Sequence, residues 1–99
     1  MSSSQVESSI PLAREVSVSD DLLTVELTDG RRISAPTSWY PRLAQASSSE
    51  RLNWRLIGRG TGIHWPDLDE DISVEGLLEG RRSGESEASI QHWLESRTG

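Results

Sequence analysis

Alternating apolar and polar side chains between residues 14 and 35 constrain the fold of this chain more than any other feature. In the run LLTVELT, Leu23, Val25 and Leu27 occupy every second position, with polar residues between them. This period of two is typical of a strand that is buried on one face and wet on the other. The DG pair that follows signals a two-residue hairpin of type I′, in which both central residues need positive φ. The sequence therefore predicts a three-stranded antiparallel meander.

Composition removes several classes of protein chemistry. The chain has 99 residues, no Cys, and only Arg among its ten basic residues. Without Cys there are no disulfides, thiolate zinc sites or cysteine nucleophiles, which fits a reducing compartment. Without Lys there is no Schiff-base or P-loop lysine. The net charge of -6 argues against tight general DNA binding, which depends on cationic neutralisation of phosphates.

The chain divides into three parts. Residues 1–13 are polar and Ser-rich, without the basic and apolar regions of a signal peptide, and predict a disordered lead. Residues 14–80 form the predicted domain. Residues 81–99 read as a linker and a C-terminal amphipathic helix, in which Ile90, Trp93 and Leu94 share one face. No run is long enough to span a membrane, so we expect a cytoplasmic protein.

The middle of the chain changes from a strand-like to a helical pattern. Thr37 or Ser38 could cap a short helix with Pro41 in its first turn. Ser47 and Glu50 have the spacing of a capping box, which predicts a second short helix. The runs NWRLIGRG and GIHW then resemble two strands. The predicted fold is α+β: a small two-layer sandwich, with an antiparallel sheet of about five strands, short helices on one side and the C-terminal helix.

The acidic run between residues 67 and 71 invites comparison with a calcium loop. Its acids have the spacing of the first ligands, but Ile72 and Leu78 replace the required Gly and Glu. Ser73 is a plausible N-cap with Glu75 in the first turn, and Gly80 fits the end of the same helix. We therefore interpret the acids as the approach to a helix, where they favourably meet the positive end of its dipole.

Enzymatic sites find little support in the remaining motifs. His64 and His92 are the only imidazoles and lack a metal-binding spacing. No G-x-S-x-G element accompanies the many serines. We expect no cofactor, no metal and no enzymatic activity. The least favoured alternative is an acid-based hydrolase or metal-binding protein that uses His64 with Asp67, Asp69 and Asp71.

Arginine and aromatic residues interleave between residues 39 and 59. They belong to the segment 31–59, which carries a charge of +5 between two acidic segments. Such groups suit a protein hot spot or single-stranded nucleic acid. The alternative is that the tryptophans are core residues and the arginines pair with the acids. The predicted partner-binding residues are Trp39, Arg42, Arg51, Trp54, Arg55, Arg59, His64, Trp65, Asp67, Asp69, Asp71 and Trp93.

Several motifs resemble a known family. They are DGR at 29–31, the pattern P-x-x-W-x-P-R-L at 36–43, ER-x-NW at 50–54, and G-x-G-IHWP-x-LDED-x-SV-x-GLL at 60–78. Over residues 14 to 80 the chain resembles the bacterial family catalogued as domain of unknown function 2442, and its tail resembles longer members.

This resemblance implies a small two-layer α+β fold without established catalytic residues. Members also resemble components of two-gene modules, beside another short protein or fused to a helix-turn-helix, which implies an antitoxin-like or regulatory role. This chain has no helix-turn-helix pattern. We expect a small protein encoded nearby as the partner. The alternative is nucleic acid bound through the Arg-rich middle. We expect no membrane binding, and the chain could form a homo-oligomer.

Overall fold

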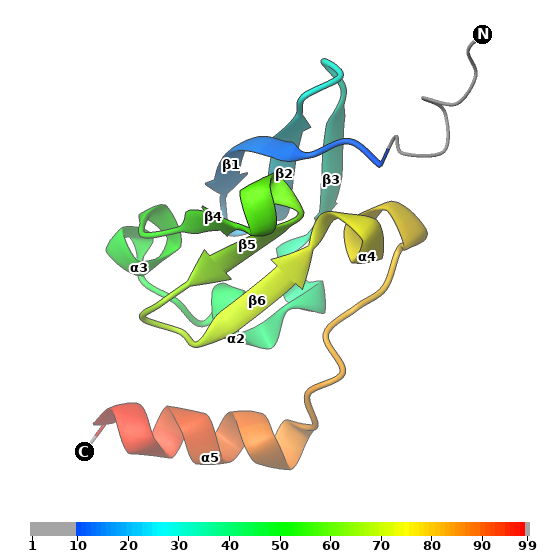
Figure 1. The fold of residues 1–99 in the computed structure, drawn as a ribbon. Helices are drawn as coiled ribbons and strands as arrows, with labels where there is room; N and C mark the ends of the chain where they lie inside the picture. Colours follow the sequence, from blue (N-terminus) through cyan, green and yellow to red (C-terminus); the bar gives the residue numbers. More distant parts are fainter. Residues whose placement is uncertain (1–9, 99) are drawn as a thin grey trace, which may run out of the picture.

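The computed structural model describes residues 10–98 and contains two three-stranded antiparallel sheets (Figure 1). Each sheet is a meander whose strands pair in chain order. The first sheet contains β1 (Ala13–Val18), β2 (Leu22–Leu27) and β3 (Arg32–Pro36). The second contains β4 (Arg55–Ile57), β5 (Gly62–Trp65) and β6 (Glu70–Ser73). The α+β class is confirmed, with two small sheets in place of the predicted single sheet of about five strands.

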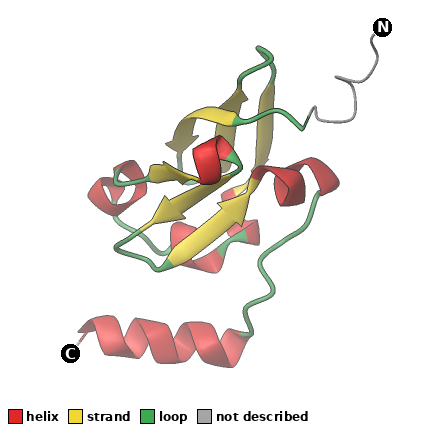
Figure 2. Cartoon of the chain, in the orientation of Figure 1, coloured by secondary structure: helices red, strands yellow, loops and turns green. Residues whose placement is uncertain are grey.

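Short helices connect these strands, and the longest helix ends the chain (Figure 2). The connections and the terminal helix are η1 (Thr37–Trp39), α2 (Pro41–Ala44), α3 (Ser48–Leu52), η2 (Gly58–Gly60), α4 (Val74–Glu79) and α5 (Glu87–Thr98). None of the helices within residues 10–98 is long and apolar enough to cross a bilayer.

The predicted N-terminal meander is confirmed, but its hairpin turn differs. Leu23, Val25 and Leu27 are fully buried. Four residues, 28–31, lie between β2 and β3. The Leu27 amide donates to the Arg31 carbonyl and the Gly30 amide donates to the Leu27 carbonyl, which closes a three-residue loop from Thr28 to Gly30. Gly30 has φ 92, whereas Asp29 does not have positive φ. This geometry is a type I turn followed by a left-handed glycine, so the prediction of a type I′ turn was wrong.

The acidic run forms a strand that the sequence did not predict. After Trp65 the chain reverses in a tight turn, in which the Leu68 amide bonds the Trp65 carbonyl and Asp69 adopts φ 52. The chain then returns along β5 as β6, with Trp65 opposite Glu70. Pairing with β5 satisfies backbone groups that an unpaired approach to the helix would leave in water, which explains why a strand replaces the expected loop.

The expected helix after this run is confirmed in its caps. The Ser73 hydroxyl accepts a hydrogen bond from the Gly76 amide, with Glu75 in the first turn of α4. Gly80 ends the helix in the left-handed conformation, at φ 76. The capping box of Ser47 and Glu50 is also present at the start of α3.

The predicted cap of the first helical segment was wrong. Pro36 precedes η1 and no side chain caps it, while α2 has Tyr40 at its N-cap and Pro41 at its first position. The hydroxyl of Thr37 is fully buried and donates to the Ser19 carbonyl. Thr37 therefore ties the end of the meander to the loop between β1 and β2.

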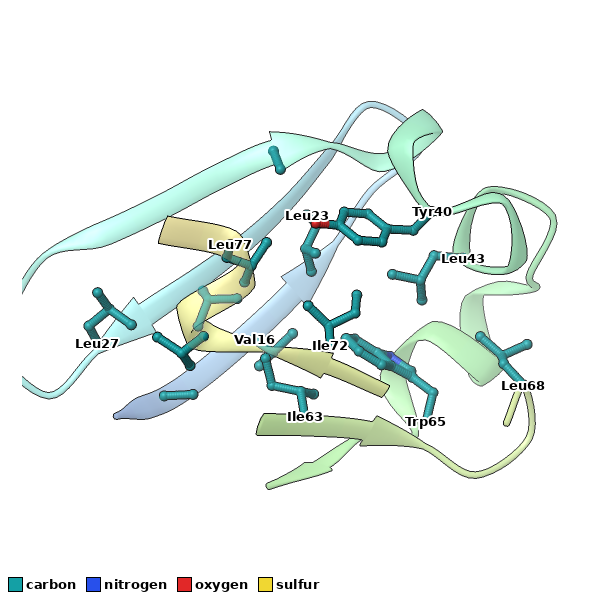
Figure 3. Packing of buried hydrophobic residues seen from close by; sticks show 14 residues of the cluster. Val16, Leu23, Leu27, Tyr40, Leu43, Ile63, Trp65, Leu68, Ile72 and Leu77 are labelled. Atoms are coloured by element: carbon teal, nitrogen blue, oxygen red, sulfur yellow. The ribbon is translucent and has the colours of Figure 1, made fainter. Parts of the chain in front are cut away.

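The hydrophobic core lies between the two sheets and is closed by Tyr40, Leu43 and α4 (Figure 3). Trp65 is the largest fully buried side chain. Three further tryptophans, Trp39, Trp54 and Trp93, are partly buried and pack against the core from its margins. Apolar burial of this kind is the main force that holds so small a chain together.

The N-terminal end of the domain differs from the predicted boundary. Strand β1 begins at Ala13, and Leu12 before it exchanges hydrogen bonds with Thr28. The expected disorder is therefore wrong for Leu12, and the lead up to residue 9 lies outside the described residues.

At the C-terminal end, α5 runs beside the domain on the side of α2, after an extended linker (Figure 1). The apolar face of α5 is buried at Ile90 and partly buried at Trp93.

Candidate functional site

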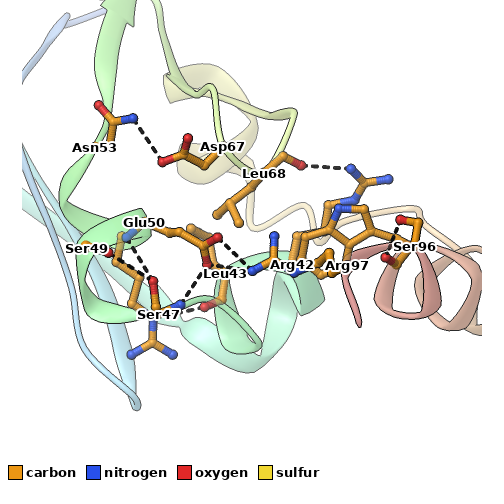
Figure 4. Close-up of polar contacts among 12 residues, drawn as sticks. Arg42, Leu43, Ser47, Ser49, Glu50, Asn53, Asp67, Leu68, Ser96 and Arg97 are labelled. Carbon is orange, nitrogen blue, oxygen red and sulfur yellow. Dashed lines mark hydrogen bonds and ion pairs between the residues drawn. The ribbon is translucent and has the colours of Figure 1, made fainter. Parts of the chain in front are cut away.

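The side chain of Arg42 is bonded to groups of the same chain and is not free to bind a partner. Its guanidinium donates to the Leu68 carbonyl at 2.8 Å and to both carboxylate oxygens of Glu85, at 2.9 and 2.7 Å (Figure 4 shows the Leu68 contact). It also lies over the Trp93 ring, 5.0 Å from the ring centre. The hydrogen bonds from Arg42 hold the pKa of Glu85 below its usual range. Arg42 therefore fastens the C-terminal linker and α5 to the domain.

Arg51 is likewise occupied within the fold. It donates to the carbonyls of Leu43 and Ala44, at 3.0 and 3.1 Å, and to Asp20 at 2.8 Å. The two carbonyls lie at the end of α2, where a helix has no internal donors for them. Arg42 and Arg51 therefore pair with acidic groups of the same chain, as the alternative interpretation of the sequence expected.

The tryptophans predicted to bind a partner take different places. Trp65 is fully buried, and its indole nitrogen donates to the Arg51 carbonyl at 3.2 Å, so it cannot touch another molecule. Trp39 lies beneath the guanidinium of Arg82, and Trp93 lies beneath that of Arg97. Trp54 is partly buried against the core. Alternation could not separate these roles, because a large indole suits both a core and a contact surface.

The acidic residues and the histidine lie on β5, on β6 and in the turn between these strands. The His64 ring nitrogen Nδ1 lies in hydrogen-bond contact with the carboxylate of Asp71, its neighbour across the strands. Asp67 accepts a hydrogen bond from Asn53 at 3.0 Å (Figure 4). Asp69 lies in the turn before β6, where its backbone adopts a positive φ. Within residues 10–98 no group of three or more His, Asp or Glu side chains could hold a metal ion.

The edge strand β4 and the residues beside it form the most exposed apolar surface, which we name the β4 edge: Leu52, Arg55, Leu56, Ile57 and Arg59. Leu52 is 76% exposed, Leu56 37% and Ile57 39%. In the described part of the chain, the guanidiniums of Arg55 and Arg59 have no hydrogen-bond or ion-pair partner. Among residues 10–98, strand β4 pairs only with β5, and no strand in this range pairs with its other side.

The backbone around η2 holds the β4 edge against the first sheet. Arg59 and Gly60 both have positive φ, at 62 and 101. A side chain at Gly60 would meet the Ala13 carbonyl oxygen at 2.9 Å, so only glycine permits this approach. The sequence indicated a turn at this place, but it could not indicate that the turn packs on β1.

A cavity that sequence analysis missed lies on the opposite side of the second sheet. It has a volume of about 260 Å³ and lies between β6, the start of α4 and the linker. Its lining residues are Tyr40, Glu70, Asp71, Ile72, Ser73, Gly76, Arg81, Arg82, Ser83 and Gly84. Burial raises the pKa of Glu70 to about 7, although the charge of Arg42 acts in the opposite direction. The spacing of Glu70 and Ile72 places both on one face of a strand, but the sequence did not predict that this segment is a strand.

These features define a small α+β domain of two antiparallel meanders, with an open strand edge on one side and a polar cavity on the other. The chain belongs to the family described as protein of unknown function DUF2442, whose family model matches residues 13–83. Helix α5 lies beyond the matched segment.

Two solved structures share this fold. A crystal structure of a protein of unknown function from Rhodospirillum rubrum is 26% identical, with a TM-score of 0.67, and the match covers 83% of this chain and 99% of that one. A solution NMR structure of an uncharacterized protein from Chromobacterium violaceum is 22% identical, with a TM-score of 0.67, over 90% of this chain and 83% of that one. The search of curated proteins found no match.

Proposed function

We propose that this chain is a non-enzymatic interaction module that binds an acidic, extended segment of a small partner protein at the β4 edge. The observation that supports this proposal most strongly is the concentration of open groups there. Three of the six large apolar side chains that are exposed within residues 10–98 lie between Leu52 and Ile57. An exposed strand edge with apolar side chains is a template for another strand.

Strand addition would use the backbone and the side chains of β4 together. The open side of an edge strand presents unpaired N–H and C=O groups, and an incoming strand satisfies them. Leu56 and the neighbouring Ile57 point to opposite faces of the sheet, because successive residues in a strand alternate. An added strand could therefore cover one apolar side chain on each face, while Leu52 extends the contact beyond the strand.

The positive charge of the β4 edge indicates the kind of segment that would bind there. Arg55 and Arg59 leave two unneutralised positive charges at the β4 edge, so a segment with acidic side chains would be drawn to it. A second copy of this chain is a poorer occupant, since pairing of two β4 edges would bring four arginines together. The proposal thus favours a different protein over a homo-oligomer.

The two-gene arrangement associated with the family suggests where the partner is encoded. We propose that it is the neighbouring short protein and that this chain is the antitoxin-like or regulatory member of the pair. The nucleic-acid alternative has weaker support, because Arg42 and Arg51 are bound within the fold. Only Arg55 and Arg59 of the four arginines remain for phosphates, which is few for a protein of net charge -6.

Charge reversal at the β4 edge tests this proposal. The chain is co-expressed with its neighbouring gene product, and affinity is measured by calorimetry. Arg55→Glu with Arg59→Glu should weaken binding about a hundredfold, because attraction becomes repulsion at two positions. A matched double reversal, Arg31→Glu with Arg32→Glu, changes the net charge equally at the distant hairpin and should leave affinity within about threefold.

The outcomes separate the alternatives. Equal loss in both double variants would show a general charge effect and contradict a specific β4 contact. Recovery of nucleic acid in place of a protein, seen as absorbance at 260 nm, would favour the nucleic-acid alternative. Self-association of the purified chain through β4 would identify a second copy as the occupant.

A further inference from the structure

The cavity beside β6 contains an acidic group that lacks a counterion. The carboxylate of Glu70 is half-buried and has no hydrogen-bond or ion-pair partner anywhere in residues 10–98. The nearby cation, Arg42, is already committed to Glu85 and to the Leu68 carbonyl. A half-buried carboxylate without a partner is costly, and an incoming cationic donor would restore the missing interaction.

The surroundings of Glu70 account for its raised pKa. Burial raises its pKa to about 7; Glu85 in the linker and Asp69 and Asp71 beside β6 act in the same direction, while Arg42 opposes them. Tyr40, between η1 and α2, also lines the cavity. Burial raises the pKa of its phenol, and the charge of Glu70 acts in the same direction. A ligand cation that approached Glu70 would favour the ionised carboxylate.

The other wall of the cavity is cationic. Arg82 lies over the Trp39 ring, 4.6 Å from the ring centre, and has no carboxylate partner among the described residues. Its neighbour Arg81 is paired with Glu79 at 2.9 Å. Arg82 is thus the guanidinium that remains open to an anionic group, and stacking on Trp39 limits its freedom.

The linker backbone that carries Arg82 is fixed over the cavity at two points. The Tyr40 hydroxyl donates to the Arg81 carbonyl at 3.0 Å, and the Ser83 amide donates to the Trp39 carbonyl at 3.1 Å. These contacts hold the cationic wall opposite β6 before any ligand arrives. Preorganisation of this kind reduces the entropic cost of binding.

The mixed charge restricts the ligand. A simple cation would meet Arg82 as well as Glu70, and a simple anion would meet Glu70 as well as Arg82. A volume of about 260 Å³ lies below the usual range for drug-sized ligands and suits a small molecule. We propose that the cavity binds a small zwitterion, a free amino acid, with its ammonium group at Glu70 and its carboxylate at Arg82.

This inference is independent of the proposed function. Strand β6 is the opposite edge of the second sheet from β4, since the strand order is β4-β5-β6. The amino-acid site and the β4 edge are therefore tested by different variants. Loss of one activity leaves the other measurable.

Matched probes test the need for both charges. L-Alanine is compared with ethylamine, which lacks the carboxylate, and with propionate, which lacks the ammonium group, in titrations followed by NMR. L-Alanine should shift the backbone amide signals of Glu70 and of Arg82 to Gly84, and each single-charge probe should bind at least about tenfold more weakly. Ethylamine or propionate binding as tightly as L-alanine would overturn the proposal, as would no shift with L-alanine at about 50 mM, well above common metabolite affinities.

Variants show whether Glu70 and Arg82 contact the ligand. Glu70→Gln keeps the size of the side chain and should lose L-alanine binding, and Arg82→Gln should do the same. Glu75→Gln, on the exposed face of α4, is the control and should bind like the original chain. Unchanged L-alanine binding by a folded Glu70→Gln variant would exclude the site.

Proton release gives a readout that a purely structural role would not produce. Because the ligand cation favours ionised Glu70, binding at pH 7 should release protons. Calorimetry in two buffers with different ionisation enthalpies should therefore give different apparent binding enthalpies. Identical enthalpies in both buffers would contradict contact between the ammonium group and Glu70.

Discussion

The guanidinium of Arg42 donates two hydrogen bonds to the carboxylate of Glu85, of 2.9 and 2.7 Å. These bonds join the domain to its C-terminal segment. Both side chains are largely shielded, at 18% and 14% exposed. Arg97 of α5 adds a second attachment to Glu50, through two contacts of 2.7 Å (Figure 4). Charged groups therefore join the linker and α5 to the domain beside the buried Ile90, although α5 lies beyond the segment that the family shares.

The variant Arg42→Ala should loosen the linker and lower the free energy of unfolding by about 2 kcal/mol, because the Leu68 carbonyl loses its donor and the Glu85 carboxylate keeps only the hydroxyl of Ser89. Urea denaturation measures the loss, and trypsin should cleave faster after Arg81 or Arg82. Arg31→Ala removes only the exposed pair with Asp29 and should cost less than about 0.5 kcal/mol. Equal losses in the two variants would contradict the role given to Arg42.

Stability should depend on Glu70 between about pH 4.5 and 7. Its pKa in the folded chain is raised to about 7 from an ordinary value of 4.5. The folded state therefore holds the proton more tightly, so this contribution to stability is full below pH 4.5 and is lost as pH rises through 7. Glu70→Gln should remove this loss and stabilise the chain at pH 8 by about 2 kcal/mol relative to the original.

The test of that expectation is a pair of urea titrations at pH 5 and pH 8. The difference between the variant and the original chain should be larger at pH 8 than at pH 5. A difference that is the same at both pH values would show that Glu70 keeps its ordinary pKa in the folded chain.

The variant Trp93→Ala should release α5 while residues 13–83 stay folded. Trp93 lies between Arg42 and Arg97, at 5.0 and 4.5 Å from its ring centre, and packs against the edge of the core. A detached helix of 12 residues is marginal in water, so the helical circular dichroism should fall. His92→Ala, on the exposed side of α5, is the control.

Hydrogen exchange locates the effect of Trp93→Ala. Amides of α5 should exchange at least about tenfold faster, whereas those of β2 should be unchanged. Faster exchange throughout β2 would show instead that α5 is required for the whole fold.

Local patterns predicted the elements that depend on neighbours in sequence. The alternation around Val25 fixed the buried face of the meander, and the Ser47, Ser73 and Gly80 caps are formed by groups within one helical turn. Strand β6 was not predicted, because its pairing with β5 depends on the turn at Asp69, where a non-glycine residue adopts positive φ. A run of acids gives no indication of such a reversal.

The candidate site was predictable only in part for the same reason. Arg51 and Arg55 have equal chemistry in the sequence, but only Arg51 reaches the carbonyls at the end of α2. Trp65 and Trp93 likewise differ in burial because of where β5 and α5 come to lie. Contacts between segments that are distant in the chain decide which arginine has no partner within the fold. They also decide which acidic residue lines a cavity.

The measurement that most directly tests the proposed function is hydrogen exchange of the chain with and without its neighbouring gene product. Binding by strand addition should slow exchange of amides in β4, between Arg55 and Ile57, because the partner backbone becomes their acceptor. Amides of β3, at an edge of the other sheet, should be unaffected. Protection confined to α5 or to the acidic turn at 67–69, with none in β4, would contradict the account.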